Sequence, residues 1–239
     1  MKRALVTGGS GGIGAAIARK LAANGCEVLV HANSNLDRAE TVATEIRAGG
    51  GQAHALAFDV TNVAATLAAL EAELQSGPIQ IVVNNAGIYA DAVFPAMSHD
   101  KWASVIDVSL NGFFNVTQPL TLPMIRTRWG RIVNITSVAG IVGNRGQVNY
   151  AAAKGALHAA TKSLALELAS RGITVNAVAP GIIDTGMIEG VFDAEAIKKL
   201  VPMQRAGKPE EVAELVAFLA SDQAAYLSGQ VISINGAMI

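Results

Sequence analysis

The residues most suited to chemistry are a tyrosine and a lysine in the second half of the chain. Tyr150 and Lys154 are four positions apart, so on a helix they share one face about one turn from each other. A phenol has a pKa of about 10, and a neighbouring ammonium stabilises the phenolate and lowers that pKa. A phenol tuned in this way can give a proton to a carbonyl oxygen as a hydride reaches the carbonyl carbon. On its own, however, the pair is more typical of the exposed face of an amphipathic helix.

Ser137 adds a hydroxyl that fits the same chemistry. It follows the apolar run 131–135 and precedes Tyr150 by thirteen residues. At the carboxyl end of a parallel strand, this hydroxyl would lie beside a bound cofactor and hydrogen-bond a substrate carbonyl. A serine in the turn Thr136-Ser137 also has an ordinary structural use. The hypothesis therefore rests on the three side chains together.

A glycine-rich string near the start of the chain predicts a dinucleotide site. Residues 7–14 read Thr-Gly-Gly-Ser-Gly-Gly-Ile-Gly and lie between a short apolar run and a helical pattern. Glycine permits a sharp turn and a close backbone approach to a pyrophosphate, and the helix N-terminus offers unpaired N–H groups. The alternative is a tight strand-to-helix turn packed by small residues. The residues expected to contact the cofactor here are Gly8, Ser10, Gly12, Ile13 and Gly14.

The end of the second predicted strand bears on the choice of cofactor. Residues 31–35 contain no carboxylate, and the first acidic residue after them is Asp37. A carboxylate at this place would bind a ribose 2′-hydroxyl and repel a 2′-phosphate. Asn33 and Ser34 can instead donate hydrogen bonds to phosphate oxygens, so the sequence favours NADP(H). An ordinary polar loop with a helix cap explains the same residues.

The elements that must position these residues alternate regularly along the chain. Short β-branched runs are separated by helical patterns, which is the order of parallel strands joined by crossover helices. Ile13, Ile17 and Leu21 mark one face of a first helix that ends at Asn24-Gly25. We therefore predict a doubly wound (Rossmann) α/β fold, with a seven-stranded parallel sheet and helices on both faces. The predicted strands are 4–7, 27–31, 53–58, 79–84, 131–135, 174–179 and 230–234.

Length and composition exclude several classes of protein. The 239 residues predict one domain spanning 1–239, and 51% hydrophobic against 15% charged residues excludes intrinsic disorder. A net charge of -1 argues against nucleic acid as a partner. One cysteine and four scattered histidines predict neither a disulfide scaffold nor a metal site.

Hydropathy bears on location and assembly. No run approaches the ~18 apolar residues of a membrane helix, so a cytoplasmic protein without a membrane partner is expected. A mean hydropathy of +0.37 is high for a monomer and predicts a homo-oligomer.

The motifs occur in the order and spacing of a known family. The chain resembles a short-chain dehydrogenase/reductase, and within that family it is most similar to the 3-oxoacyl-[acyl-carrier-protein] reductases. The resemblance covers nearly the whole chain and implies NADPH-dependent reduction of a 3-oxoacyl thioester to the 3-hydroxyacyl thioester. Besides residues 8–14, it rests on Asp59-Val60, Asn84-Asn85-Ala86-Gly87, Asn111, Ser137, Tyr150 with Lys154, and residues 180–185.

The resemblance also implies a role for each matching residue. Tyr150 would be the proton donor, Lys154 would lower its pKa and hold the nicotinamide ribose, and Ser137 would orient the carbonyl. Asn111 would hold a water that links Lys154 to solvent, and the poor helix sequence Asn111-Gly112 would free backbone groups for that water. For Val60 and Ile183, core packing is an equally good explanation. Cofactor contacts are further implied for Asp59, Val60, Asn84, Ala86, Gly87, Pro180, Gly181, Ile183 and Thr185.

Two arginines bear on the form of the substrate. Family members that act on carrier-bound thioesters dock an acidic carrier protein on basic residues near the site entrance, and Arg128 and Arg171 hold the matching positions. The helix dipole alone also explains Arg171.

The substrate and the assembly leave alternatives open. Coenzyme A thioesters are the other carrier form. Other candidate functions are a polyketide or polyene ketoreductase, an acetoacetyl-CoA reductase, a small-alcohol dehydrogenase and a catalytically idle NADP-binding scaffold. The family pattern implies a homotetramer.

One residue departs from the family pattern, and one long stretch of the chain has no regular pattern. Many relatives carry an arginine near the 2′-phosphate where this chain has Gly11. Residues 181–204 form the least regular stretch, a long connection near the carboxyl edge of the predicted sheet. Such excursions often cover substrates, so we expect a lid here.

Overall fold

A computed structural model describes residues 1–185 and 194–239 of the chain. In these residues seven strands form one all-parallel sheet with the order β3-β2-β1-β4-β5-β6-β7. Every predicted strand boundary lies within two residues of the observed one. The predicted doubly wound α/β fold is therefore confirmed. The strands are β1 (Arg3–Val6), β2 (Glu27–Ala32), β3 (Gln52–Ala57), β4 (Ile81–Asn84), β5 (Gly130–Ile135), β6 (Ile173–Pro180) and β7 (Val231–Ile234).

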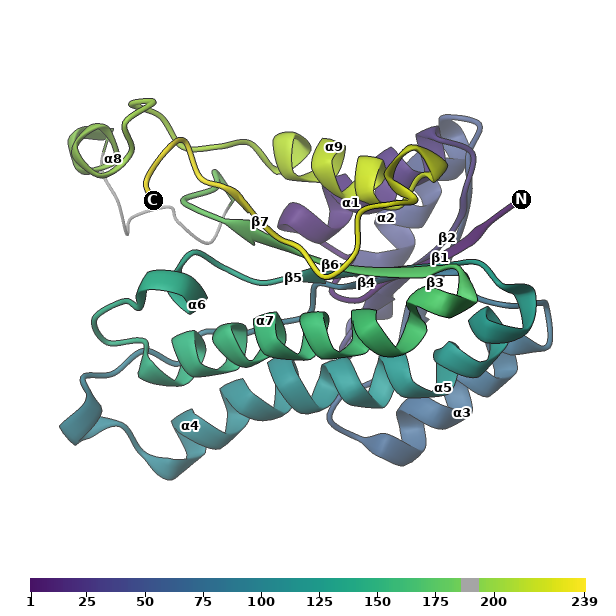
Figure 1. The fold of residues 1–239 in the computed structure, drawn as a ribbon, viewed down its shortest axis with the longest axis horizontal. Coiled ribbons are helices and arrows are strands. Elements are labelled where there is room, and N and C mark those ends of the chain that lie inside the picture. The colour runs from purple at the N-terminus through teal and green to yellow at the C-terminus, as the bar shows by residue number, and fades with distance from the viewer. Residues whose placement is uncertain (186–193) are drawn as a thin grey trace.

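Helices cover both faces of the sheet (Figure 1). In that view α1, α2 and α9 lie above the sheet, and α3, α4, α5 and α7 lie below it. Short 3₁₀ segments η1 (Phe94–Ala96), η3 (Ala169–Arg171) and η4 (Asp222–Ala224) and a π-helical turn η2 (Asp107–Asn111) complete the elements. The helices are α1 (Gly12–Ala23), α2 (Leu36–Ala48), α3 (Val63–Leu74), α4 (His99–Ile106), α5 (Gly112–Thr127), α6 (Ala139–Val142), α7 (Val148–Leu168), α8 (Ala194–Leu200) and α9 (Pro209–Leu219).

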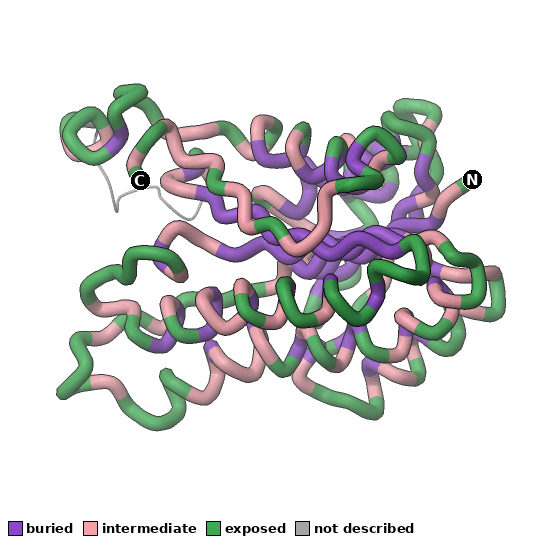
Figure 2. The backbone as a smooth tube through the Cα atoms, in the orientation of Figure 1, coloured by how far each residue is buried: buried purple, intermediate pink, exposed green. Residues whose placement is uncertain are grey.

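Apolar layers pack between the sheet and the helices on both of its faces. The inner strands β1, β2, β4, β5 and β6 are buried along most of their length, whereas the edge strands β3 and β7 are largely half-buried or exposed (Figure 2). Strands covered on both faces need continuous apolar runs rather than alternation, which is why these segments read as short β-branched runs. On α1, Ile17 and Leu21 are buried as their spacing predicts. The helix ends at Ala23, and Gly25 takes a positive φ of 85°. Its predicted end at Asn24-Gly25 is thus confirmed.

The strand order fixes where a ligand can bind. The chain leaves β1 towards β2 and β3, then returns to β4 on the other side of β1. The connections on either side of this reversal diverge and leave a crevice at the carboxyl edge of the sheet. The glycine-rich string, which joins β1 to α1, and the turn after β4 both lie there. None of the helices in the described ranges is both long and apolar enough to cross a bilayer.

Candidate active site

A cavity of about 670 Å³ lies at this carboxyl edge. The glycine loop, the turn after β4, the turn after β5, α7 and the segment after β6 all contribute to its lining. The structure therefore brings together residues that are more than 170 positions apart in the sequence. The predicted site residues that line the cavity are Gly8, Ile13, Gly14, Ala86, Gly87, Ser137, Tyr150, Lys154, Pro180, Gly181, Ile183 and Thr185.

Helix α7 positions the tyrosine and the lysine on one face, as their spacing predicts. Both side chains are buried, with 7% of Tyr150 and 3% of Lys154 exposed. The Lys154 ammonium donates a 2.9 Å hydrogen bond to the carbonyl of Ile135, the last residue of β5. Its Nζ lies 5.7 Å from the centre of the Tyr150 ring. The lysine is thus fixed between α7 and the sheet, beneath the tyrosine ring.

The environment of the phenol differs from the simple tyrosine–lysine picture. Burial raises the pKa of Tyr150 well above its ordinary value, the nearby Tyr89 raises it further, and a hydrogen bond with Ser137 opposes the rise. Burial lowers the pKa of the Lys154 ammonium to about 8. The ammonium is directed at a backbone carbonyl, so desolvation decides the pKa of the phenol in the free protein. At neutral pH Tyr150 is therefore a protonated phenol and Lys154 mostly a cation.

The glycine loop is held from one side by β4. The amide of Asn85 donates to the carbonyls of Thr7 and Gly8, at 2.9 and 3.1 Å. The Thr7 hydroxyl in turn accepts from the backbone N–H groups of Asn85 and Ala86, each at 3.0 Å. A Cβ at Gly14 would come within 2.2 Å of the Gly8 carbonyl oxygen, so this close approach requires glycine. Asn85 was absent from the predicted site residues, although it stands inside the Asn84-Asn85-Ala86-Gly87 motif.

A histidine holds the loop from the other side. The Gly8 N–H donates to His31 Nδ1 at 3.1 Å, and the Gly9 N–H donates to the His31 carbonyl at 2.8 Å. His31 Nε2 lies 2.8 Å from the carbonyl of Phe58, so the neutral ring accepts at Nδ1 and donates at Nε2. Burial lowers the pKa of His31 to about 4, which keeps the ring neutral at physiological pH. His31 was not predicted to take part in the site.

Comparisons with known proteins agree with this geometry. Residues 2–196 match the family model described as short chain dehydrogenase. The chain belongs to the short chain dehydrogenase family.

Several curated relatives match nearly the full length. A protein of Aggregatibacter actinomycetemcomitans named 3-oxoacyl-[acyl-carrier-protein] reductase FabG is 47% identical over 98% of both chains. A protein of the same name from Pseudomonas aeruginosa is 46% identical over 99% of this chain and 97% of its own. Nodulation protein G of Rhizobium sp. (strain N33) is also 46% identical, over 99% of this chain and 96% of its own. The predicted resemblance is confirmed.

As a short chain dehydrogenase, the chain is an oxidoreductase that uses a nicotinamide cofactor. The cavity fits such a group, because it extends from the glycine loop to Tyr150 and Lys154. The loop carries no side chain at Gly8, Gly11 or Gly14, so backbone lies bare along one wall. Helix α1 has no acidic residue in its first turn, which leaves its N-terminus positive towards a pyrophosphate.

The Asn111 side chain does not lie where its predicted role would place it. Its side chain is exposed, donates to Asp107 Oδ1 at 2.7 Å, and does not line the cavity. The residue of the same π-helical turn that faces inward is Ser109, which is buried. A Cβ built on Gly87 would lie 3.2 Å from Lys154 Nζ and 3.7 Å from Ser109 Oγ. The Ser109 hydroxyl and the Lys154 ammonium therefore both border Gly87, whereas the Asn111 side chain is bound to Asp107.

A signal for Ser109 exists in the sequence. Val105, Ser109, Gly112 and Val116 recur every three or four residues and are all buried, whereas Asn111 falls between two of them. The weak helix sequence Asn111-Gly112 correctly indicates an irregular turn, but the helical period decides which side chain points inward. Among the described residues, the Ser109 hydroxyl is buried without a hydrogen-bond partner.

The predicted adenosine-binding residues form a looser group outside the cavity lining. Asn33 and Ser34 are exposed beyond the end of β2. Ser10 and Gly12, predicted as contacts of the glycine string, stand where that string enters α1 and also lie outside the cavity lining. Asp59 is also exposed, and its carboxylate accepts from the N–H and hydroxyl of Thr61, at 2.9 and 2.8 Å. Their contacts with a cofactor stay predictions.

Two other predicted contacts are buried in the fold. Val60 packs in the core beside Gly112, as its alternative explanation allows. Asn84 lies beneath the cavity, where its amide donates to Thr117 Oγ1 and Asn134 Oδ1 at 2.9 Å each. This buried polar chain joins β4 to α5 and β5.

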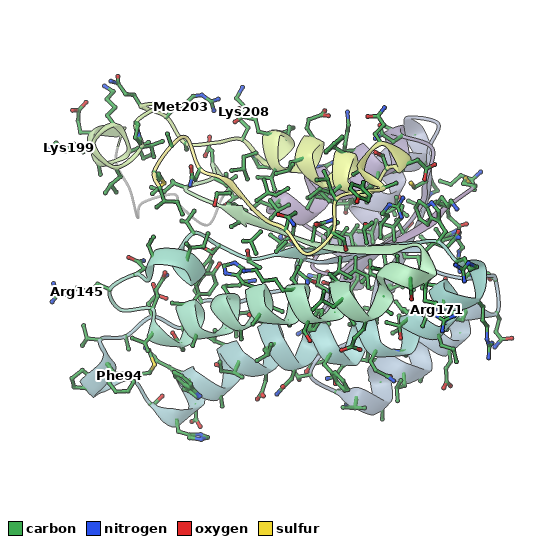
Figure 3. The ribbon with its side chains drawn as sticks, viewed as in Figure 1. Phe94, Arg145, Arg171, Lys199, Met203 and Lys208 are labelled. Atoms are coloured by element: carbon green, nitrogen blue, oxygen red, sulfur yellow. The ribbon has the colours of Figure 1, made fainter. Side chains whose placement is uncertain are left out.

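The two arginines predicted to receive a carrier protein lie close together but far from the cavity of their own chain. Arg128 ends α5 and donates to the carbonyl of Ser170 at 3.1 Å, next to Arg171. Both precede the amino ends of β5 and β6, whereas Ser137 follows the carboxyl end of β5. A strand of this length separates the two ends by about 20 Å. Arg171 accordingly lies at the opposite end of the molecule from Phe94 and Met203 (Figure 3). Within one chain, the expectation that Arg128 and Arg171 lie at the entrance of the cavity is therefore wrong.

The expected lid lies partly within the described residues. Of residues 181–204, the segment 186–193 falls outside them. Ile182 and Leu200, on either side of that segment, both line the cavity.

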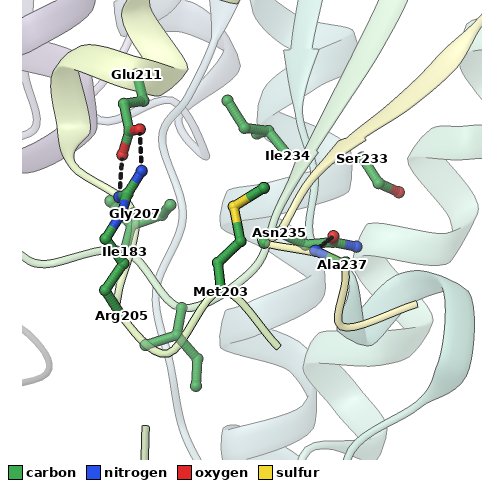
Figure 4. Close-up of a pocket in the computed structure, with 11 residues that line it drawn as sticks. Ile183, Met203, Arg205, Gly207, Glu211, Ser233, Ile234, Asn235 and Ala237 are labelled. Carbon is green, nitrogen blue, oxygen red and sulfur yellow. Dashed lines mark hydrogen bonds and ion pairs between the residues drawn. The ribbon is translucent and has the colours of Figure 1, made fainter. Parts of the chain in front are cut away.

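A second cavity of about 400 Å³ lies between the segment after β6 and the C-terminal residues (Figure 4). Arg205 and Glu211, paired by hydrogen bonds of 2.6 and 2.7 Å, form its charged side, and Met203 its apolar side. It shares Ile182 and Ile183 with the first cavity.

Proposed function

We propose that the chain reduces 3-oxoacyl thioesters, bound chiefly to an acyl carrier protein, to 3-hydroxyacyl thioesters with NADPH. The observation that carries the proposal is the convergence of Ser137, Tyr150 and Lys154 on a cavity that begins at the glycine loop. The names of the relatives support the choice of substrate, because several 3-oxoacyl-[acyl-carrier-protein] reductases match at 44–47% identity over nearly the whole chain.

The catalytic roles follow from the protonation states. Reduced nicotinamide supplies a hydride when it is bound. Tyr150 is a protonated phenol and gives its proton to the ketone oxygen, so the C=O group gains one hydride and one proton. Ser137 hydrogen-bonds the same oxygen and holds it at the phenol. The Lys154 cation stabilises the phenolate that remains until Tyr150 regains a proton.

The mouth of the cavity supports an acyl substrate. Tyr89 and Val142 line it and remain 52% and 62% exposed, and Leu200 is 48% exposed. Exposed apolar side chains around a polar centre give an acyl chain a surface to cover while its ketone reaches Tyr150. The lid function of residues 181–204 stays a proposal of the same kind.

The preference for NADP(H) rests on the end of β2. Asn33 and Ser34 are exposed there, and residues 31–36 contain no carboxylate. Neutral donors and a lack of negative charge favour a 2′-phosphate over a free 2′-hydroxyl. The test is the ratio of kcat/KM for NADPH and NADH, and equal or better use of NADH contradicts the preference.

Assembly as a homotetramer is also proposed. Phe114 and Leu166 are 62% and 85% exposed on α5 and α7, and Phe218 and Tyr226 are exposed near α9, on the other side of the sheet. Two apolar faces on one chain favour two kinds of subunit contact. Light scattering of the purified chain tests this, and a monomeric mass refutes it. Cytoplasmic location stays a prediction from the sequence.

The experiment that tests the reaction follows NADPH absorbance with one 3-oxoacyl chain presented on acyl carrier protein, on coenzyme A and as a small thioester. Turnover of all three with preference for the carrier form supports the proposal. An absence of turnover with every thioester refutes it.

Charge reversal at Arg128 and Arg171 extends the assay. If these residues dock the carrier, the double variant loses activity on the carrier form more than on the small thioester. An equal loss on both contradicts docking there.

A further inference from the structure

The glycine loop is approached by an arginine that the motifs do not include. Arg38 stands in the first turn of α2, where its backbone N–H donates to the side chain of Asn35, the N-cap residue, at 3.1 Å. From there its guanidinium reaches across to the loop. A Cβ built on Gly11 would lie 3.0 Å from Arg38 Nη2, which is closer than side chains normally pack.

A side chain at position 11 would therefore displace the Arg38 guanidinium by a few tenths of an ångström. Gly11 caps α1 with an extended backbone, φ −177° and ψ 171°, which any residue adopts. The backbone thus does not require glycine at this position, unlike at Gly14. Because Gly11 has no side chain, the space beside the Arg38 guanidinium stays free.

The charge of Arg38 is uncompensated. In residues 1–185 and 194–239 its guanidinium takes part in no ion pair and no hydrogen bond. Two neighbouring arginines behave differently, because Arg19 on α1 pairs with Glu45 and Arg47 on α2 pairs with Glu40. Arg38 is exposed and keeps five N–H donors for a ligand.

The place of this cation points to one part of the cofactor. The residues between the end of β2 and the start of α2 are those that meet the adenosine ribose in a dinucleotide fold, and an arginine near them accommodates a 2′-phosphate. Asn33 and Ser34 are exposed on the same connection. A guanidinium binds a phosphate through two parallel charge-assisted hydrogen bonds, which a ribose hydroxyl cannot match.

We propose that Arg38 binds the 2′-phosphate of NADP(H), and that glycine at position 11 leaves room for its guanidinium to do so. The chain thereby places a positive charge from α2 beside the glycine loop, which has no side chain at position 11. This inference rests on the proposed preference for NADP(H). It names the residue that produces the preference.

Binding of cofactor to the purified full chain, measured by calorimetry without substrate, tests the proposal. Arg38→Gln weakens NADPH binding by about 10- to 100-fold and leaves the Kd for NADH unchanged within about twofold. The matched control is Arg19→Gln, which removes the same charge from a paired arginine on α1 and leaves both dissociation constants unchanged. Both side chains are exposed, so neither substitution threatens the fold.

Relocation of the charge provides a second measurement. Gly11→Arg in the Arg38→Gln background restores tighter binding of NADPH than of NADH, because a cation again lies beside the loop. Rising salt should also reduce the difference in affinity between NADPH and NADH in the wild-type chain, because the contact of Arg38 with the phosphate is exposed and therefore screened. In Arg38→Gln the same rise in salt should reduce that difference less.

The outcomes separate this inference from the function on which it rests. A wild-type chain that binds NADH as tightly as NADPH overturns both. A wild-type preference for NADPH that survives Arg38→Gln overturns the role of Arg38 alone. Equal weakening of both cofactors also overturns it, because Arg38 would then contact a part that the two cofactors share.

Discussion

The two ends of the proposed cofactor and substrate site are built on different principles. At the catalytic end, Tyr150 and Lys154 are buried, and an apolar layer with a lysine–carbonyl hydrogen bond holds them in place. At the adenosine end, Asn33 and Ser34 are exposed on the connection between β2 and α2, and Arg38 is exposed in the first turn of α2. From this difference we expect the chemistry to depend on desolvated side chains in fixed positions. We expect selection of the cofactor to depend on exposed side chains whose contribution salt can screen.

The largest effect is expected at the catalytic end, from Tyr150→Phe. The ring keeps its volume and its packing but loses the proton that the ketone oxygen receives. We expect kcat to fall by about 10³-fold, with little change in the Kd for NADPH, in the absorbance assay and calorimetry. Tyr89→Phe is the matched control, because it removes the neighbouring hydroxyl and should cost far less. Near-native turnover by Tyr150→Phe would remove the proposed proton donor.

His31 is buried, unlike the exposed residues of the adenosine end. It should make the free energy of unfolding depend on pH under acidic conditions. Its pKa is about 4 in the folded protein and 6.5 ordinarily, so the unfolded chain takes up the proton first. The contribution of neutral His31 to the free energy of unfolding is therefore complete above pH 6.5. It decreases by about 3 kcal/mol as the pH falls to about 4.

The measurement is the free energy of urea unfolding between pH 4 and 7. His31→Gln provides the comparison, because its amide can donate and accept but does not titrate. The variant should therefore show a shallower fall than the wild-type chain, and identical pH dependence of the two would exclude His31 as the source.

At the catalytic end, the reaction rate should depend on pH in the alkaline range. The pKa of Lys154 is about 8, so its cation is lost as the pH rises through that value. Because the cation stabilises the phenolate left by Tyr150, we expect kcat for reduction to fall about tenfold per pH unit above 8. A rate profile at saturating NADPH measures this. A rate that stays flat up to pH 10 would contradict the role of the charge.

Ser109 and Asn111 allow a comparison within one helical turn. Ser109 is buried beside Gly87 and Lys154, whereas the Asn111 side chain is bound to Asp107 at the surface. If the inward hydroxyl takes part in returning a proton to the site, Ser109→Ala lowers kcat by about tenfold with an unchanged KM. Asn111→Ala should stay within about twofold. The reverse result would restore the role predicted for Asn111.

The placement of the side chains at the catalytic end could be predicted from the sequence because its information is local. A four-residue interval places Tyr150 and Lys154 on one helix face, and a strand end places Ser137 at the carboxyl edge. His31 and Arg38 were not predicted because their roles arise between elements. A histidine in a β-strand and an arginine on a polar helix turn are ordinary until β2 and α2 are packed beside the glycine loop. Arg128 and Arg171 were assigned to the entrance by a family pattern alone, although the predicted strands 131–135 and 174–179 already place them before the amino ends of two strands, opposite the carboxyl edge.

The smallest effect is expected from the neutral donors of the adenosine end. Asn33 and Ser34 are exposed, so each hydrogen bond to a phosphate replaces one to water and contributes little. We expect the double variant Asn33→Ala, Ser34→Ala to bind NADPH about 3- to 10-fold more weakly in calorimetry, with NADH unchanged. This loss should be smaller than that of Arg38→Gln, because a guanidinium brings charge as well as donors. A double variant that lost more than Arg38→Gln would show that neutral donors, rather than a cation, govern the choice of cofactor.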